Sequence, residues 1–79
     1  MNKQDINKKL IEIFSLVFGK EFTAEDNLSM ENFEDWSSLK HIELIVALEE
    51  YFEVSIKPEN IPELTSKEKI IDYLSNILE

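Results

Sequence analysis

WSSLKHIELIVALEEYF, residues 36–52, is the segment of the chain with the clearest hydrophobic pattern. Its apolar residues recur at helical spacing and predict a helix from about Ser38 to Phe52. These residues fall into two stripes along that helix. The first stripe is suited to a core and consists of Leu44, Ile45, Leu48 and Phe52. The second is rotated away from the first and consists of Leu39, Ile42 and Val46.

The second stripe has two interpretations that the periodicity leaves open. A central helix in a small bundle is buried on most sides, which would place this stripe in the core. An apolar strip flanked by Glu43, Glu49 and Glu50 is also suited to docking a partner helix or groove.

The chain before this segment predicts one helix and one long loop. Apolar residues at helical spacing indicate a helix over about residues 3–18, and the only glycine, Gly19, follows as a C-terminal stop. Residues 19–36 show no sustained period and form a longer connection than the roughly 2–8 residues usual in helical bundles. Their apolar side chains are too frequent for a disordered segment, and we expect four of them to hold the loop on the bundle: Leu28, Met30, Phe33 and Trp36.

The chain after this segment predicts a short helix and a final longer one. Pro58 breaks the central helix, and one short helical turn is expected before Pro62 stops it. The last helix is expected over about residues 66–78. Thr65 would be its N-cap, and Glu68, three residues later, would complete a capping box.

The fold predicted from these segments is all-α. It is a four-helix bundle with three longer helices, one short helix and a long loop between the first two, in a single domain over residues 1–79. The sequence has no Cys and one His, so a disulfide or a metal is not expected to stabilise it, and the helical core has to suffice. The absence of Cys also fits a reducing cytoplasm.

The charge of the chain is strongly negative and unevenly distributed. The formal net charge is −9, and residues 21–53 supply all of it with ten acids and one lysine. Nucleic-acid binding needs a basic footprint and is therefore excluded. A one-sided negative field favours basic partner surfaces, although acidic faces also keep small domains in solution. No apolar stretch is long enough to span a bilayer and no signal peptide is evident, so we expect a cytoplasmic protein without a membrane partner.

Catalytic chemistry has few candidate residues in this chain. Ser38 and His41 form a Ser–His pair on one helix face, but neither an oxyanion site nor a substrate cleft is evident. The loop acids do not match the calcium-loop pattern, so no metal site is expected. We therefore expect the protein not to be an enzyme.

Ser37 and Ser38 open the central helix, and two roles suit a serine at this place. It can be an N-cap whose hydroxyl accepts a hydrogen bond from a free backbone N–H. It can also carry a phosphodiester, which the unpaired N–H groups and the positive end of the helix dipole would stabilise.

Residues 36–52 resemble the acyl carrier protein family around its phosphopantetheine attachment site. That family opens its second helix with an Asp-Ser-Leu triplet and continues with an acidic and apolar run that ends in Leu-Glu-Glu, one variable residue and Phe. Here the triplet is Ser37-Ser38-Leu39 and the run ends at Leu48-Glu49-Glu50-Tyr51-Phe52. The resemblance extends over nearly the whole chain, and it implies the bundle described above, in monomeric form.

The resemblance implies a role for individual residues. Ser38 would receive a 4′-phosphopantetheine arm from coenzyme A through a phosphopantetheinyl transferase, with Ser37, Leu39 and His41 beside it. The arm would hold an acyl or aminoacyl group as a thioester, as in fatty acid or polyketide biosynthesis, for loading and transferring enzymes with basic docking surfaces. The partner-recognition face would consist of Leu39, Ile42, Glu43, Val46, Glu49 and Glu50.

The assignment includes one departure from the family, at Ser37, and leaves alternatives for His41 and for the function. Ser37 stands where the family usually has Asp, and Asp35 is hypothesised to replace part of the missing charge. His41 would either contact the phosphate and nearby Glu residues or be an exposed polar residue, whereas Trp36 is expected to pack the loop. The alternative function is an acidic helical interaction or inhibitor module, including a degenerate carrier that is no longer modified.

Overall fold

The computed structural model describes residues 2–78 and confirms the all-helical prediction for that part of the chain. Its elements, in chain order, are α1 (Lys3–Phe18), α2 (Ser38–Phe52), the 3₁₀ helix η1 (Pro58–Glu63) and α3 (Lys67–Leu78). Among these residues the only bridge of β type is an isolated pair, Ser29 with Ser66.

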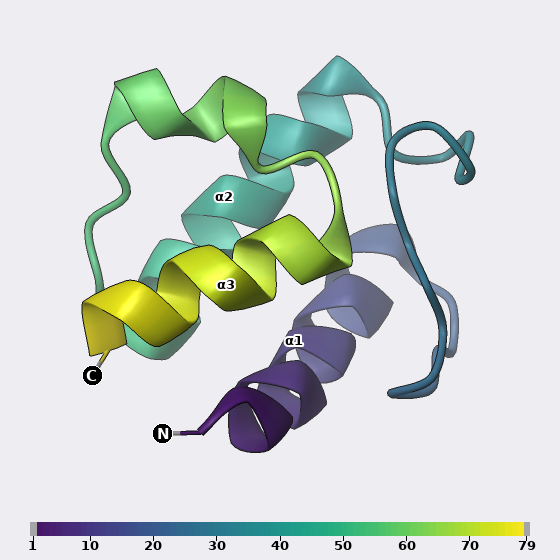
Figure 1. Ribbon diagram of the computed structural model, residues 1–79. Helices are drawn as coiled ribbons and strands as arrows, with labels where there is room; N and C mark the ends of the chain where they lie inside the picture. Colours follow the sequence, from purple (N-terminus) through teal and green to yellow (C-terminus); the bar gives the residue numbers. More distant parts are fainter. Residues whose placement is uncertain (1, 79) are drawn as a thin grey trace.

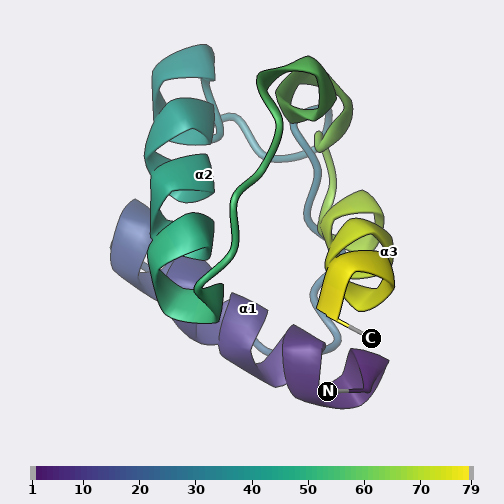
Figure 2. The same cartoon turned by 90° about the vertical axis from the view of Figure 1, so that its left-hand side faces the viewer.

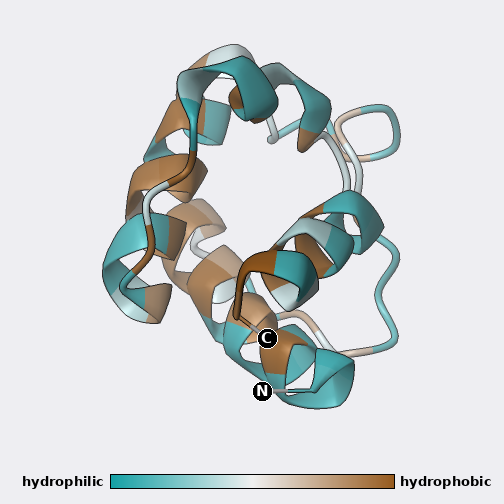
Figure 3. Cartoon of the chain, turned by 60° about the vertical axis from the view of Figure 1, so that its left-hand side comes forward, coloured by the Kyte–Doolittle hydropathy of each residue, from teal (hydrophilic) through white to brown (hydrophobic). Residues whose placement is uncertain are grey.

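The helices α2 and α3 both pack on α1, which crosses beneath them (Figures 1 and 2). The long loop and η1 close the space between α2 and α3 at the opposite end (Figure 2). Each of the longer helices carries both hydrophobic and hydrophilic residues, as an amphipathic helix does (Figure 3). The apolar positions meet in one core, whose fully buried members are Ile6, Leu10, Ile13, Phe14, Leu44, Leu48, Ile70 and Leu74.

Both ends of α1 are capped. The Asn2 side chain accepts a hydrogen bond from the Asp5 N–H at 2.8 Å. Gly19 takes the left-handed conformation at φ 66°, and its N–H donates to the Ser15 carbonyl at 2.9 Å. The predicted glycine stop is thus confirmed, because this conformation costs Gly no steric energy.

Aromatic side chains hold the long loop on α1, as expected. Trp36 is 2% exposed and its ring meets that of Phe14 edge to face, with centroids 5.3 Å apart. Phe33 packs in the same way against Phe18 at 4.9 Å. Leu28 is also buried and Met30 packs against the core, so all four predicted anchors of the loop are confirmed.

The loop has a polar attachment that the sequence did not predict. Lys67, the first residue of α3, is buried, and its Nζ donates to the Ala24 carbonyl at 2.7 Å. Its backbone N–H donates to the Leu28 carbonyl at 2.8 Å. Burial lowers the pKa of the Lys67 ammonium, and the nearby charges of Asp26 and Glu25 oppose that shift. One lysine thereby joins two points of the loop to α3.

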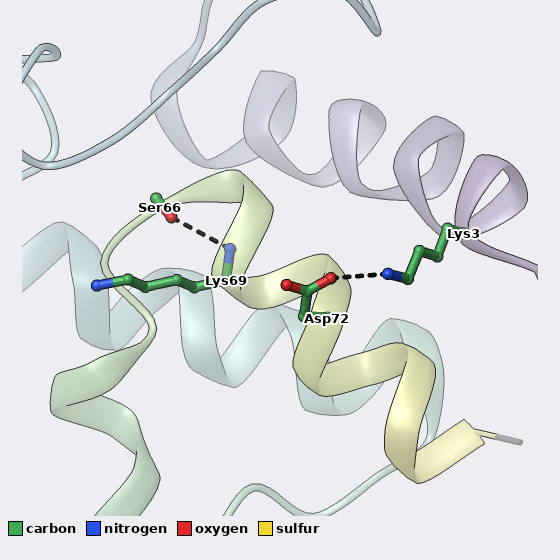
Figure 4. A network of polar contacts seen from close by, with 4 residues as sticks. All are labelled: Lys3, Ser66, Lys69 and Asp72. Atoms are coloured by element: carbon green, nitrogen blue, oxygen red, sulfur yellow. Dashed lines mark hydrogen bonds and ion pairs between the residues drawn. The ribbon is translucent and has the colours of Figure 1, made fainter.

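The last helix lies where it was predicted, but its predicted N-cap is wrong by one residue. Ser66, not Thr65, is its N-cap, with the Ser66 hydroxyl accepting from the Lys69 N–H at 3.1 Å (Figure 4). The Thr65 carbonyl instead accepts from the Met30 N–H at 2.9 Å, which keeps Thr65 outside the helix. Glu68 consequently lies two residues after the cap rather than three, and the predicted capping box does not form.

The predicted end of the short helix is also wrong. Pro62 lies inside η1, which continues to Glu63. A 3₁₀ turn tolerates this proline because its fixed φ suits the helix and only one backbone donor is missing. An exposed ion pair joins α3 to α1, with Lys3 Nζ 3.0 Å from Asp72 Oδ1 (Figure 4).

Candidate functional site

The start of α2 is capped by Ser37. Its backbone is extended, its hydroxyl accepts from the Lys40 N–H at 3.3 Å, and its carbonyl accepts from the His41 N–H at 2.8 Å. Ser38 is the first helical residue and is exposed. Within residues 2–78, no group forms a hydrogen bond with the Ser38 hydroxyl. The two serines thus divide the two roles: Ser37 caps the helix and Ser38 keeps a free hydroxyl at its tip.

The surroundings of Ser38 combine a positive helix end with paired charges. The backbone N–H groups of Ser38 and Leu39 have no acceptor among the described residues, so they remain available to an anion. The Lys40 ammonium donates to the Val17 carbonyl, the last turn of α1, at 3.1 Å and pairs with Glu43 at 3.1 Å. Lys40, two residues after Ser38, therefore binds the C-terminal end of α1.

The carboxylate of Asp35 is also paired. Its Oδ2 lies 2.6 Å from Lys20 Nζ, and this ammonium stands over the Phe33 ring at 5.4 Å from the centroid. The pair is about half exposed on both sides, so the two charges offset one another at close range. The hypothesis that Asp35 replaces the charge missing at Ser37 stays a prediction.

His41 is buried at 6% exposure, so the expectation of an exposed polar residue is wrong. Its Nδ1 lies 3.0 Å from Trp36 Nε1, and its Nε2 lies 2.8 Å from the Ile61 carbonyl. An indole N–H can only donate, so Nδ1 accepts, and the ring proton is on Nε2, which donates to Ile61. Both ring nitrogens thus have protein partners, which leaves contact of His41 with an attached arm as a prediction.

The second stripe of α2 is exposed, so its burial in the core is the wrong interpretation. Leu39 is 71% exposed, Ile42 52% and Val46 49%, whereas the first stripe is buried as predicted. These are the largest apolar exposures on α2 apart from Tyr51 at 49%, which sequence analysis did not single out. An apolar strip of this kind on a small domain indicates a surface that meets a partner.

The three acids that flank this strip differ in their surroundings. Glu43 pairs with Lys40, as described above. Glu49 is half-buried, and its Oε2 accepts from the Ile56 N–H at 2.9 Å, which holds the segment after α2 against the helix. Glu50 is exposed and has no partner within residues 2–78. Its carboxylate is therefore the most available of the three.

Three other kinds of site are relevant to the rest of the described chain, namely a membrane span, a metal site and a pocket beside Ser38. None of its helices is long and apolar enough to cross a membrane. Across residues 2–78, no three His, Cys, Asp or Glu side chains gather to hold a metal ion. Two surface hollows lie elsewhere, one beside Leu16 and Phe22 and one beside Leu64 and Tyr73, and neither includes Ser38.

Comparison with known proteins adds one relative. The acyl carrier protein of Buchnera aphidicola subsp. Schizaphis graminum is 33% identical over 75 residues, which cover 91% of this chain and 92% of the relative. The chain belongs to the acyl carrier protein family. No family model and no solved structure matches it. Membership favours a carrier protein over an enzyme, and the helical bundle agrees with the resemblance seen in the sequence.

Proposed function

We propose that this acyl carrier protein family member tethers an acyl or aminoacyl group to Ser38 through a 4′-phosphopantetheine arm and presents it to partner enzymes. The observation that carries the proposal is the exposed, unpartnered hydroxyl of Ser38 on the first residue of α2. A capping serine would have its hydroxyl engaged with the backbone, and Ser37 already has that role.

The residues around Ser38 fit a phosphate ester. The free N–H groups of Ser38 and Leu39 and the positive end of the α2 dipole favour a negative group at this place. Ser37 stands at the N-cap, where the family usually has Asp, and the nearest acid before it, Asp35, is paired with Lys20. When bound, the arm would supply the thiol that this Cys-free chain lacks.

Attachment would use the Ser38 hydroxyl as the nucleophile. Its Oγ would bond to the phosphorus that carries the pantetheine in coenzyme A. The pyrophosphate P–O bond would break, adenosine 3′,5′-bisphosphate would leave, and the serine proton would pass to a base of the phosphopantetheinyl transferase. The only histidine of the sequence, His41, is not placed as a base for this step, because its two ring nitrogens face Trp36 and Ile61.

Partner enzymes would dock on the exposed strip of Leu39, Ile42 and Val46. The acids Glu43, Glu49 and Glu50 supply a negative frame, and basic partner surfaces would complement it. A carrier has to be released after each transfer, and a small strip with screened charges gives weak, reversible binding. Docking should therefore weaken as ionic strength rises; an affinity that is the same at low and high salt would contradict this part of the proposal.

Intact-protein mass spectrometry tests the proposal directly. The purified chain is incubated with coenzyme A and a broad-specificity phosphopantetheinyl transferase, and a gain of one phosphopantetheine is expected. Ser38→Ala should abolish the gain, whereas Ser55→Ala, at another exposed serine, should not. No gain with several transferases would refute the carrier proposal and favour the acidic interaction or inhibitor module, including a carrier that has lost its modification.

A further inference from the structure

The hydrogen-bonded chain Trp36–His41–Ile61 joins three separate parts of the molecule. Trp36 ends the long loop, His41 lies in the first turns of α2, and Ile61 lies in η1. Trp36 and His41 are both more than nine-tenths buried, so water does not compete for the bond between them. Neither the carrier chemistry at Ser38 nor the docking strip uses these groups.

The direction of the two bonds is fixed by chemistry. Trp36 can only donate and the Ile61 carbonyl can only accept, so Nδ1 of His41 accepts and its Nε2–H donates. The same ring is therefore bonded to η1 through Nε2 and to the indole through Nδ1. A displacement of η1 would move the ring through the Nε2–H bond, and it would thereby change the length of the bond between Nδ1 and the indole.

The indole is close in sequence to Ser38, since Trp36 lies two residues before it. Trp36 directly precedes the N-cap Ser37, and the backbone N–H of Trp36 donates to the Phe33 carbonyl at 3.1 Å within the same turn. A second bond holds η1 from the other side, since Asn60 Nδ2 donates to the Tyr73 hydroxyl of α3 at 3.3 Å. The helix η1 is thus bonded to His41 of α2 and to Tyr73 of α3. Of these two residues, only His41 is also bonded to Trp36, which lies next to the turn that carries Ser38.

We propose that His41 is a positioning residue that couples η1 to the turn bearing Ser38. A partner that presses on η1 would thereby alter how Ser38 is presented. This use rests on the proposed function, but the coupling itself is a property of the unmodified chain. The two can fail separately, because the test below needs neither coenzyme A nor a modified serine.

Nuclear magnetic resonance of the ¹⁵N-labelled chain gives the test, since it has one tryptophan and one histidine. In the wild-type chain at neutral pH, Nδ1 of His41 should be unprotonated and Nε2 protonated. The opposite tautomer would overturn the proposal. Tyr73→Phe, which releases η1 from α3, should shift the Trp36 indole N–H signal although it removes no group that touches Trp36.

Two further variants complete the design. Tyr51→Phe is the matched control, because it makes the same chemical change at an exposed tyrosine of α2 without a bond to η1. It should leave the indole signal in place. In a His41→Gln background with retained helical circular dichroism, Tyr73→Phe should no longer shift the signal. A shift that persists there, or one no larger than that of Tyr51→Phe, would overturn the coupling; the second comparison needs no His41 variant and holds even if His41→Gln does not fold.

Discussion

The residue that precedes the candidate attachment site, Ser37, can affect the protein in two ways, by capping α2 and by the charge at this position. Replacing Ser37 separates these two effects. Ser37→Ala removes the hydroxyl that accepts from the Lys40 N–H. Loss of a serine N-cap costs about 0.5–2 kcal/mol. The O···N distance of 3.3 Å is long and the serine is exposed. Water can therefore replace part of the bond, and the lower half of that range, about 0.5–1 kcal/mol, is expected.

Ser37→Asp should act in the opposite direction. Asp caps a helix about as well as Ser, so the bond to the Lys40 N–H is kept. The added carboxylate also interacts with the positive end of α2, which stabilises by about 0.3–1 kcal/mol at low ionic strength. The order of stability is therefore expected to be Asp, then Ser, then Ala at this position.

Urea unfolding followed by circular dichroism and by the fluorescence of Trp36 measures these differences. In a domain of this size a change of about 1 kcal/mol moves the melting temperature by roughly 4–8 °C, so thermal melts give a second measure. Ser55→Ala is the matched control, since this exposed serine caps no helix. If Ser37→Ala is as stable as the wild-type chain, the cap assigned to Ser37 is wrong.

The same variants test whether the charge of the usual Asp, which Ser37 lacks, affects the rate of modification at Ser38. A new exposed ion pair with a basic transferase is worth about 0.2–1 kcal/mol, which corresponds to a rise in kcat/KM of roughly 1.4- to 5-fold. Ser37→Asp should show that rise and lose it at high salt, whereas Ser37→Ala, which changes no charge, should resemble the wild type. Slower modification of the Asp variant would refute the electrostatic argument.

Three further predictions concern the stability of the scaffold and the charge that precedes Ser38. Glu53 caps α2 at φ 54° without being glycine, so Glu53→Gly should stabilise by about 1 kcal/mol, and Gly19→Ala, at φ 66° with open space around it, should destabilise by a similar amount in urea melts. The lowered pKa of Lys67 means that the folded chain binds fewer protons than the unfolded one between that pKa and 10.5. The free energy of unfolding of the wild type relative to Lys67→Met should therefore rise with pH in that window; a flat difference from pH 7 to 10 would contradict the buried ammonium. Asp35→Asn should lower the modification rate if its charge replaces the one missing at Ser37, whereas Lys20→Gln, which leaves Asp35 unpaired, should raise it; unchanged rates in both would exclude that role.

The helices and the core were predictable because their signals are local. The two stripes of α2 follow from a period of 3.6 residues, and the stop at Gly19 follows from its freedom to adopt positive φ. The loop anchors were predictable because apolar side chains such as Trp36 have to be buried somewhere. Whether the second stripe of α2 is also buried was not predictable from the period, because that depends on where α1 and η1 pack.

The polar contacts of the site were not predictable, because their partners lie far away in the sequence. The Lys67 ammonium bonds to Ala24, 43 residues earlier, and His41 bonds to Ile61, 20 residues later. A lysine at the start of a helix and a histidine on its surface are both ordinary in sequence. The shift of the α3 cap from Thr65 to Ser66 has the same cause, since the competing bond of the Thr65 carbonyl comes from the long loop.

The carboxylates along α2 allow a test of whether a structural role and the proposed docking role are compatible in one residue. Glu49 accepts a hydrogen bond from the Ile56 N–H through one carboxylate oxygen, and the same side chain is one of the three acids that flank the exposed apolar strip. Glu49→Gln can keep an acceptor oxygen for Ile56 while removing the charge, whereas Glu49→Ala removes both. Glu50→Gln removes a charge that has no partner in the described part of the chain. If docking depends on the field alone, the two Gln variants should weaken partner binding equally, and only Glu49→Ala should also lower stability; a Glu49→Gln variant that loses stability as Ala does would show that Ile56 needs the charge itself.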